Sequence, residues 1–366
     1  MLEDPLNRFD ILAQRNGGTL AGRPSRDLPH NRTIFWNAFR MPYPHHSAWV
    51  ISDGAAGNER QALALASALG IPARVMALPL RAPWAWFAPR GLPGGRLALA
   101  PRDRAGFEAP WPDIAIGCGR SAALLTRMLR DLSGGDCYAV QILDPRIDPR
   151  HWDAVVAPRH DQLQGANVLT TLGSLNPVDD AWLASGREAF SEFRTLPRPR
   201  VALLVGGPRR GIEFDGALSR RLLETLQAIA HGGSVLATVS RRTPIAFAAG
   251  LRDALAAFPG TFWNGGDANP YPGLLGWADG IVVTPDSVNM LSEACAVGVP
   301  VHTVASAPLP DKIARFHAAL RERGLLTDPD TPRADVPPLR ETQAIAAQLR
   351  ARMAARTLST LEANPD

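Results

Sequence analysis

A late stretch of the chain, ADGIVVTPDSVNMLSEACAVGVPVHTV at 278–304, keeps a carboxylate inside an otherwise apolar unit. Its β-branched run, the helical pattern after it and the closing Gly-Val-Pro predict a strand, a helix and a strand. Asp286 or Ser287 is the expected helix cap. Glu293 lies two turns on, at helical spacing from the cap, so it is expected to point toward a cleft. There it could accept hydrogen bonds from two vicinal sugar hydroxyls, and a solvent-facing glutamate is the alternative.

Two other predicted strands end in glycine or arginine. VGGPRRG at 205–211 offers backbone N–H groups to a phosphate, and SRRTP at 240–244 adds two guanidiniums at the next strand end. Arginines at adjacent strand ends could clamp a diphosphate, and ordinary solvated loops are the alternative. The residues predicted to bind the diphosphate are Gly206, Gly207, Pro208, Ser240, Arg241 and Arg242.

A third such loop, DGAAGNERQ at 53–61, follows the first predicted strand. Its glycines allow a ligand to approach the backbone, and the helix start after it offers free N–H groups. A glycine-rich turn with ordinary caps is the alternative. GCGRSA at 117–122 formally fits a dinucleotide fingerprint, but it lies in the third strand–helix unit, so tight packing is the favoured interpretation. The candidate residues of the first loop are Gly54, Gly57, Asn58 and Gln61.

The elements that would position these loops alternate between short β-rich runs and longer helical patterns, which predicts parallel α/β layering. The strands are expected near 48–52, 73–78, 113–117, 138–143, 153–158 and 167–171, and then near 201–207, 234–240, 261–265, 280–284 and 299–304. Other helices are expected near 58–69, 120–131, 217–230, 244–257 and 341–356.

The Pro-Arg linker RTLPRPR at 194–200 separates the two series. We therefore predict an α/β fold of two Rossmann-like lobes with parallel sheets, a cleft between the lobes and a C-terminal helix. The predicted parts are an irregular N-terminal arm (1–47), an N-terminal lobe (48–193), a C-terminal lobe (200–325), and a spacer with a C-terminal helix (326–366).

The amino-acid composition limits the classes of partner that we expect for this protein. The net charge is only +4, Lys312 is the single lysine among 39 basic residues, and no basic run is interleaved with aromatics, so no nucleic-acid partner is expected. The three cysteines lack metal-ligand spacing and suit a reducing cytoplasm, and the only Asp-x-Asp, 328–330, lies in the tail spacer. We expect no metal site, no signal peptide and no membrane span. The sequence makes no prediction of oligomeric state.

One aromatic segment bears on localisation. LRAPWAWFAPRGLP at 80–93 sets Trp84, Trp86 and Phe87 between Arg81 and Arg90. Aromatics flanked by arginines suit a membrane interface that holds a lipid-linked acceptor, and a packed Pro-rich lid is the alternative. The protein is expected to be cytoplasmic, with peripheral attachment to the inner face of the membrane left open.

Several of these motifs together resemble a known family. SEACAVGVP at 292–300 is similar to the donor-site helix of GT-B glycosyltransferases, whose Glu binds the ribose of a nucleotide-sugar. The stretch 48–325 resembles more closely the mitochondrial fission Elm-type family, whose bacterial members are regarded as glycosyltransferases. The motifs that carry this resemblance are DGAAGNERQ, PRHDQLQGANVLTTLGSLN, LVGGP, SRRTP, NPYPGLLGWAD and VTPDSVNMLSEACAVGVPV.

The resemblance implies a metal-independent GT-B enzyme that needs no cofactor and takes a nucleotide-diphosphate sugar as co-substrate. It implies a donor pocket in the C-terminal lobe lined by Asp286, Ser287, Met290 and Glu293. The N-terminal lobe would bind the acceptor, which the sequence does not identify; the aromatic segment above makes a lipid-linked or cell-envelope molecule one candidate. His160 and Asp161 would act there, the histidine as general base, although a loop-capping His-Asp pair is equally compatible. The family usually has Gly-His where this chain has Gly57-Asn58, and Pro-Glu-His-Asp where it has Pro-Arg-His-Asp.

Two rivals remain open at this point. A non-hydrolysing nucleotide-sugar epimerase shares the architecture but needs further acid–base carboxylates in the cleft. A scaffold that recruits partners or membranes, as the plant fission factor suggests, needs none of the chemistry.

Overall fold

The computed structural model describes residues 47–266, 268–329 and 336–363. The arm predicted over 1–47 therefore falls outside the described residues except for residue 47, and so does Asp330 of the Asp-x-Asp. Within the described ranges, no helix combines the length and the apolar character needed to cross a membrane.

The first sheet has six parallel strands in the order β2-β1-β3-β4-β5-β6. Each lies where its β-rich run predicts it, and all five residues of β1, β3, β4 and β5 are buried, as in a sheet covered on both faces. Its strands are β1 (Ala48–Ser52), β2 (Ala73–Ala77), β3 (Ile114–Cys118), β4 (Tyr138–Ile142), β5 (Ala154–Pro158) and β6 (Val168–Thr171).

The second sheet has five parallel strands in the order β11-β10-β7-β8-β9. The prediction of two parallel Rossmann-like sheets is thus confirmed. Its strands are β7 (Arg200–Val205), β8 (Ser234–Val239), β9 (Gly260–Trp263), β10 (Gly280–Val283) and β11 (Val301–Thr303).

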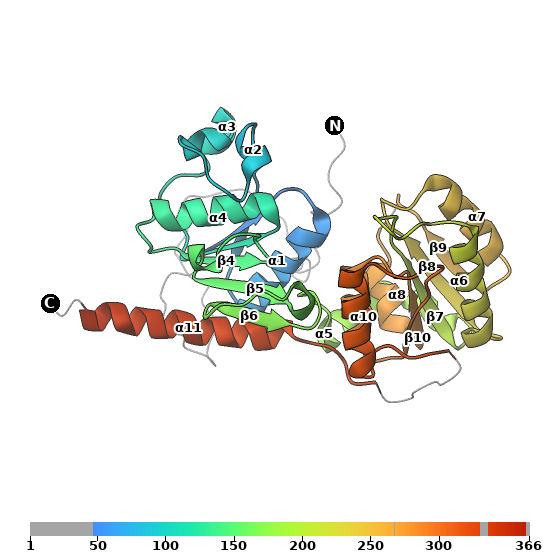
Figure 1. Ribbon diagram of the computed structural model, residues 1–366. Helices are drawn as coiled ribbons and strands as arrows, with labels where there is room; N and C mark the ends of the chain where they lie inside the picture. The colour runs from blue at the N-terminus through green and yellow to red at the C-terminus, as the bar shows by residue number, and fades with distance from the viewer. Residues whose placement is uncertain (1–46, 267, 330–335, 364–366) are drawn as a thin grey trace, which may run out of the picture. The chain divides into compact units, whose positions relative to one another are not determined.

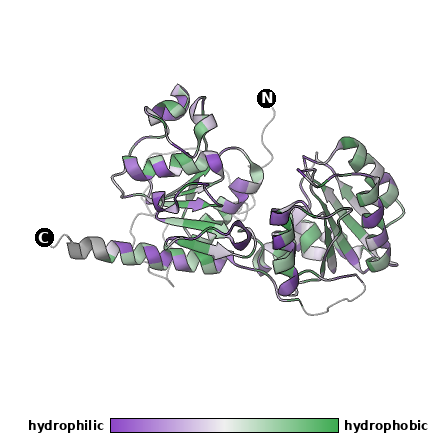
Figure 2. Ribbon diagram, in the orientation of Figure 1, coloured by the Kyte–Doolittle hydropathy of each residue, from purple (hydrophilic) through white to green (hydrophobic). Residues whose placement is uncertain are grey.

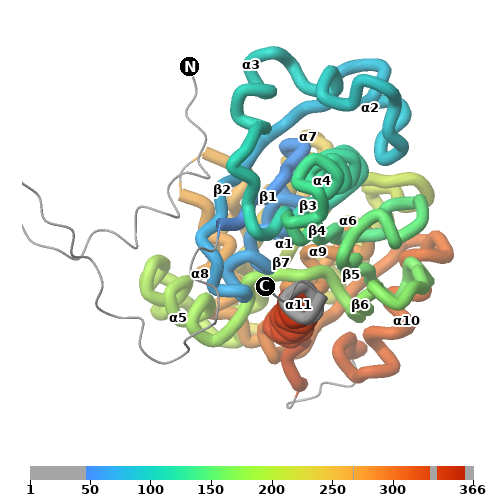
Figure 3. Tube along the Cα trace, turned by 90° about the vertical axis from the view of Figure 1, so that its left-hand side faces the viewer, coloured from blue at the N-terminus to red at the C-terminus, as the bar shows by residue number. Residues whose placement is uncertain are grey.

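Helices cover both faces of the first sheet (Figure 1). One face packs against α1 (Ala56–Leu69) and the C-terminal helix α11 (Thr342–Ala363), through Leu65 and Leu349. The other face packs against α4 (Arg120–Leu132) and the segment that carries α2 (Trp84–Phe87) and α3 (Pro101–Arg104). In the view of Figure 3, α2 and α3 again lie beyond α4, on the side away from α11.

The second sheet is layered in the same way. One face packs against α6 (Gly216–Ile229) and α7 (Ile245–Leu255). The other packs against α5 (Asp180–Ala189), α8 (Tyr271–Trp277), α9 (Val288–Cys295) and α10 (Asp311–Glu322). Figure 2 shows the hydrophobic colour gathered along the strands of both sheets.

Two helices cross between the sheets. α5 precedes the Pro-Arg linker but packs against α8, where a Cβ on Gly186 would lie 2.4 Å from the Pro272 carbonyl oxygen. α11 ends the chain but packs against α1, with Ile345 and Leu349 in the core of the first sheet. The boundaries at 193 and 326 stay predictions, whereas the packing assigns α5 to the second sheet and α11 to the first.

The helical patterns did not predict α8 or α10. α8 has the sequence YPGLLGW, whose proline and two glycines are poor helix formers, and five of its seven residues are buried. Tertiary packing against α5, rather than local propensity, holds it in the helical form.

Candidate functional site

The strand order of the second sheet places its topological switch point between β7 and β10. β7 is the first strand of its series and β10 the fourth, yet the two are neighbours. In open parallel sheets, ligands bind beyond the carboxyl ends of the strands at such a point. The loops leaving these strands begin at Gly206 and Thr284. The predicted glycine loop and the predicted cap of α9 therefore lie together.

Asp286 fills the space between these two loops. The residue is 1% exposed, and its side chain accepts hydrogen bonds from the Gly207 N–H (3.0 Å) and the Thr284 hydroxyl (2.8 Å). Arg242 Nη2 donates to the same carboxylate at 3.2 Å. Burial raises the pKa of Asp286 above its ordinary value, while the Gly207 N–H opposes the rise. A carboxylate of the chain thus occupies the cradle predicted for a phosphate.

The two glycines are required by close approach. A Cβ on Gly206 would lie 2.3 Å from both Asp286 oxygens, and one on Gly207 would lie 2.5 Å from the Arg242 Cβ. The Gly206 N–H donates to Thr284 Oγ1 at 2.8 Å. Because both N–H groups are hydrogen-bonded within the chain, their use for a phosphate stays a prediction and requires Asp286 to move.

The arginines of the loops VGGPRRG and SRRTP divide into two groups. Arg209 Nη1 donates to the Asp286 backbone carbonyl at 2.9 Å, and Arg242 reaches the side chain of the same residue. Arg241 is exposed and has no ion-pair partner among the described residues. The Ser240 hydroxyl accepts the Arg242 N–H at 3.2 Å and so orders the loop. Two guanidiniums therefore converge on the switch point and a third remains at its edge.

Glu293 lies on α9 with 3% of its surface exposed, and both of its carboxylate oxygens are engaged. Arg60 Nη1 donates to Oε1 at 2.9 Å and the Tyr271 hydroxyl donates to Oε2 at 2.5 Å. The carboxylate raises the pKa of Arg60, and burial together with the carboxylate raises the pKa of Tyr271. Glu293 therefore stands in an ion pair beside a protonated tyrosine, not in bulk water.

Arg60 comes from α1 of the first sheet, so this ion pair joins the two sheets. Gln61 follows Arg60 on α1, and Asn289 lies one turn before Glu293 on α9. Gln61 Nε2 donates to Asn289 Oδ1 at 3.4 Å, and Asn289 Nδ2 donates to the Gly57 carbonyl at 3.4 Å. The Arg60 guanidinium also lies 5.4 Å from the centre of the Tyr271 ring. The start of α1 and the face of α9 that bears Glu293 are thus in direct contact.

The first sheet has its own switch point between β1 and β3, since β1 pairs with both β2 and β3. Gly54 lies in the loop after β1 with φ +84°, and a Cβ on Gly119 after β3 would lie 2.6 Å from Asn58 Nδ2. The loops DGAAGN and GCGR therefore meet, as tight packing of the second motif requires. Among the predicted residues of this lobe, Gly57 and Gln61 face α9. Gly54 lies in the loop after β1, and Asn58, in the first turn of α1, lies next to Gly119.

His160 and Asp161 lie in the 3₁₀ turn η4 (Arg159–Asp161) after β5. His160 is 7% exposed, its ring centre lies 5.2 Å from that of Phe316 on α10, and its Nδ1 has no hydrogen-bond partner among the described residues. His160 Nε2 is 3.7 Å from Asp161 Oδ1, which pairs with Lys312. Burial, joined by nearby cations and opposed by Asp161, lowers the pKa of His160 to about 4, so its imidazole is neutral at pH 7.

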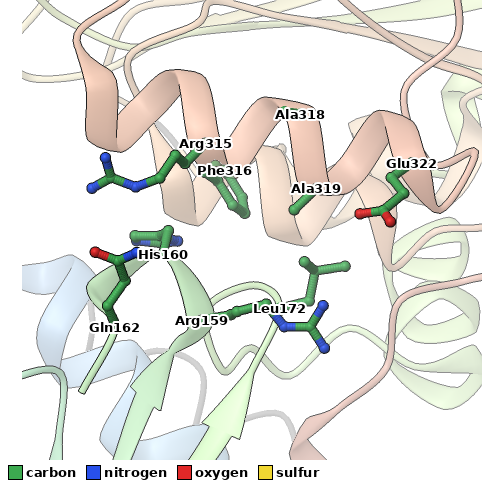
Figure 4. A pocket seen from close by; sticks show the side chains of 9 residues that line it. All are labelled: Arg159, His160, Gln162, Leu172, Arg315, Phe316, Ala318, Ala319 and Glu322. Atoms are coloured by element: carbon green, nitrogen blue, oxygen red, sulfur yellow. The ribbon is translucent and has the colours of Figure 1, made fainter. Parts of the chain in front are cut away.

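A cavity of about 530 Å³ opens beside this histidine, between η4 and α10. Figure 4 shows His160 and Phe316 close together on its wall. The cavity combines cationic, anionic, polar and apolar side chains. Its lining is Arg159, His160, Gln162, Leu172, Arg315, Phe316, Ala318, Ala319 and Glu322.

The remaining predicted residues have supporting positions. Ser287 is the N-cap of α9 and accepts the Met290 N–H at 3.3 Å, which decides between the two expected caps. Met290 is half-buried against the core of the second sheet, and Pro208 is exposed.

Sequence reasoning missed Arg60, Tyr271, Thr284 and Lys312. Arg60 stands inside the DGAAGNERQ motif, Tyr271 inside NPYPG, and Lys312 is the single lysine of the chain. Motif membership marks the first two, but no local pattern shows that they meet Glu293.

Across the described residues, no three His, Cys, Asp or Glu side chains gather as a metal site would require. Independence from metals and cofactors stays a prediction.

A model of the family described as mitochondrial fission ELM1 matches residues 56–353. Mitochondrial fission protein ELM1 of Arabidopsis thaliana is 33% identical over 281 residues, which are 68% of this chain and 66% of the plant protein. A protein of Rickettsia prowazekii (strain Madrid E) described as uncharacterized is 24% identical over 299 residues, which are 69% of this chain and 82% of that protein. The chain thus matches just under two thirds of the plant relative.

Two solved structures are similar at low identity. MurG of Acinetobacter baumannii is 16% identical with a TM-score of 0.45, covering 86% of this chain and 94% of MurG. The UDP-GlcNAc 2-epimerase of Methanocaldococcus jannaschii is 12% identical with a TM-score of 0.47, covering 83% and 99%. Since both scores lie below 0.5, we take the fold from the strand order and the family from the sequence match. On that match, the chain belongs to the mitochondrial fission ELM1 family.

Proposed function

We propose that the protein is a glycosyltransferase that moves a sugar from a nucleotide-diphosphate sugar to an acceptor hydroxyl. The observation that carries the proposal is the buried Glu293 carboxylate, which lies close to the switch point of the second sheet and is held by Arg60 of the first. A buried carboxylate paired with a residue of the other lobe, on the helix that follows β10, is a candidate for a functional site.

Glu293 would bind the ribose of the donor. An ionised carboxylate has about four acceptor positions, and Arg60 and Tyr271 use one on each oxygen. Two vicinal hydroxyls can therefore be accepted with the present partners kept or exchanged. Arg60 would orient the carboxylate, and Tyr271 would hold its second oxygen.

The diphosphate leaving group would be met by guanidiniums rather than by backbone N–H groups. Arg209 and Arg242 already converge on Asp286, and Arg241 is free to move toward a ligand. Positive groups aimed at the leaving charge do the work that a metal ion does in other transferases. Because Arg242 already pairs with the Asp286 carboxylate, a bound phosphate would compete with Asp286 for this guanidinium.

His160 would be the general base. Its low pKa keeps the ring neutral, so it can take the proton of an acceptor hydroxyl as the sugar bond forms. Asp161, paired with Lys312, would sit beside the charged ring that results. We propose a lipid-linked or cell-envelope molecule as the acceptor.

The test is a binding panel of UDP-, GDP-, ADP-, CMP- and dTDP-sugars with the purified protein. One donor class should bind saturably, and Glu293→Gln should weaken it about tenfold or more, since a hydrogen bond to a charged group contributes about 1.5–3 kcal/mol. Glu224→Gln, on the exposed surface of α6, is the matched control and should bind as the wild type does. Absence of saturable binding across the panel overturns the proposal.

One observation favours the scaffold instead. In this structure each Glu293 oxygen has a hydrogen-bond partner within the chain, and so do the Gly206 and Gly207 N–H groups. A protein that only joins partners has no need of an open donor site, so an internally paired site is what the scaffold interpretation expects. If the scaffold interpretation is right, Glu293→Ala should show the same donor binding as the wild type and should leave the biological activity intact.

A further inference from the structure

Three large apolar side chains stand in solvent within one short stretch of the first lobe. Trp86 is 72% exposed, Phe87 is 51% exposed and Leu97 is 48% exposed. Trp86 and Phe87 belong to α2, and Leu97 belongs to the 3₁₀ turn η2 (Gly95–Ala98), which contacts α2. We call these three side chains the apolar patch.

Hydrogen bonds hold the backbone segments that carry the apolar patch. The Arg120 guanidinium donates to the carbonyls of Ala85 (2.5 Å) and Trp86 (3.3 Å), and the Arg81 N–H donates to the Ala98 carbonyl at 2.8 Å. Leu99, next to the patch in sequence, is buried in the core against α4. The exposed side chains are therefore held outward by a fixed backbone and are not an uncollapsed part of the core.

The charge around the apolar patch has one sign. Between residues 78 and 102 the chain has four arginines and no Asp or Glu. Arg81 and Arg90 are exposed and have no ion-pair partner among the described residues, whereas Arg96 pairs with Glu108 at 3.0 Å in the open. An apolar centre with a cationic rim complements a surface that is apolar inside and anionic outside.

We propose that α2 and η2 dock the protein onto a lipid bilayer with anionic headgroups. Trp and Phe partition into the interface of a bilayer, and arginines beside them are attracted by anionic lipids. A protein partner fits less well, because a specific protein–protein interface needs about 20–30 residues per side, and α2 and η2 together supply far fewer residues than that. In Figures 1 and 3, α2 lies beyond α4, on the side away from α11. The inference does not depend on the proposed chemistry.

The test is flotation of the full chain with vesicles of phosphatidylcholine, and with vesicles in which roughly one third is phosphatidylglycerol. The wild type should float with the anionic vesicles and lose most of that binding in high salt. Trp86→Ala/Phe87→Ala should lower the partition coefficient about tenfold or more, and Arg81→Ala/Arg90→Ala should lower it on anionic vesicles only. Thermal melts check that both variants fold.

Ile245→Ala is the matched control, because Ile245 is 89% exposed on α7 of the other lobe, and it should float as the wild type does. The proposal is overturned if the wild type stays with the unbound fraction, or if the Trp86/Phe87 variant floats equally well. It is also overturned if the apolar patch proves to capture a protein while no vesicle binds.

Discussion

Arg60 of α1 and Glu293 of α9 form an ion pair of 2.9 Å across 233 residues of sequence, and this pair ties the first sheet to the switch-point helix of the second. The Glu293 side chain is 4% exposed and the Arg60 side chain is 41% exposed. Water therefore screens the charge at the Arg60 end of the pair, whereas the Glu293 end is shielded from solvent. The pair serves both to orient the carboxylate and to hold the two lobes together.

Breaking this pair should destabilise the protein. We expect Arg60→Ala to lower the free energy of unfolding by about 1–2 kcal/mol, below the loss for a fully buried pair because Arg60 is half-exposed. A double-mutant cycle with Glu293→Gln in urea unfolding should return a coupling energy of the same sign. Arg150→Ala, which removes an exposed pair with Asp148, should leave the midpoint unchanged. Additive Arg60 and Glu293 effects would contradict the coupling.

The glycine at the start of the second-lobe loop should not tolerate a side chain. Gly206→Ala puts a methyl group 2.3 Å from both Asp286 oxygens, so the buried carboxylate must move. We expect a loss of about 1–3 kcal/mol in unfolding free energy. Gly250→Ala is the control, since its Cβ meets nothing within 4 Å on α7, and it should stabilise by about 0.5–1 kcal/mol. Equal melting midpoints for the two variants would argue against a filled cradle.

Acid should destabilise the fold through His160. Burial lowers the pKa of His160 to about 4, whereas the unfolded chain has the ordinary value near 6.5. Between these values the unfolded chain binds a proton that the folded protein does not, so stability is full above pH 6.5 and falls as the pH falls toward 4. The loss reaches at most about 3 kcal/mol for this group.

Urea unfolding at several pH values checks this dependence. His160→Gln should flatten the slope between pH 6.5 and 4 in part, because burial also lowers the pKa of His317 to about 4. His231→Gln, on the exposed surface, should keep the wild-type slope. A His160→Gln slope as steep as the wild type would show that the ring is protonated in the fold.

If the proposed chemistry is right, His160 and Glu293 should affect different steps. His160→Ala should lower kcat by about 10²–10⁴, the usual loss of a general base, with little change in donor affinity. Glu293→Gln should weaken donor binding. Steady-state kinetics beside donor titrations separate the two effects, and a His160 variant whose only defect is donor binding would exclude the base role.

The local sequence pattern was sufficient to predict the strands and to predict which face of α9 bears Glu293. The β-branched runs alternate with helical stretches in a way that only a parallel α/β sheet satisfies, and the spacing from the cap to Glu293 follows from the helix repeat. Leu291 and Ala294, off that face, are fully buried as the same repeat requires.

Tertiary structure decided what each functional side chain meets. Nothing in the sequence near Glu293 names Arg60, and nothing in VGGPRRG shows that Asp286 occupies the N–H cradle, because these contacts join segments far apart in the chain. The same holds for α5 and α11, which pack on the sheet opposite to their place in the sequence. Side-chain pattern reports which face of an element is apolar, but the partner of that face depends on how the chain returns in three dimensions.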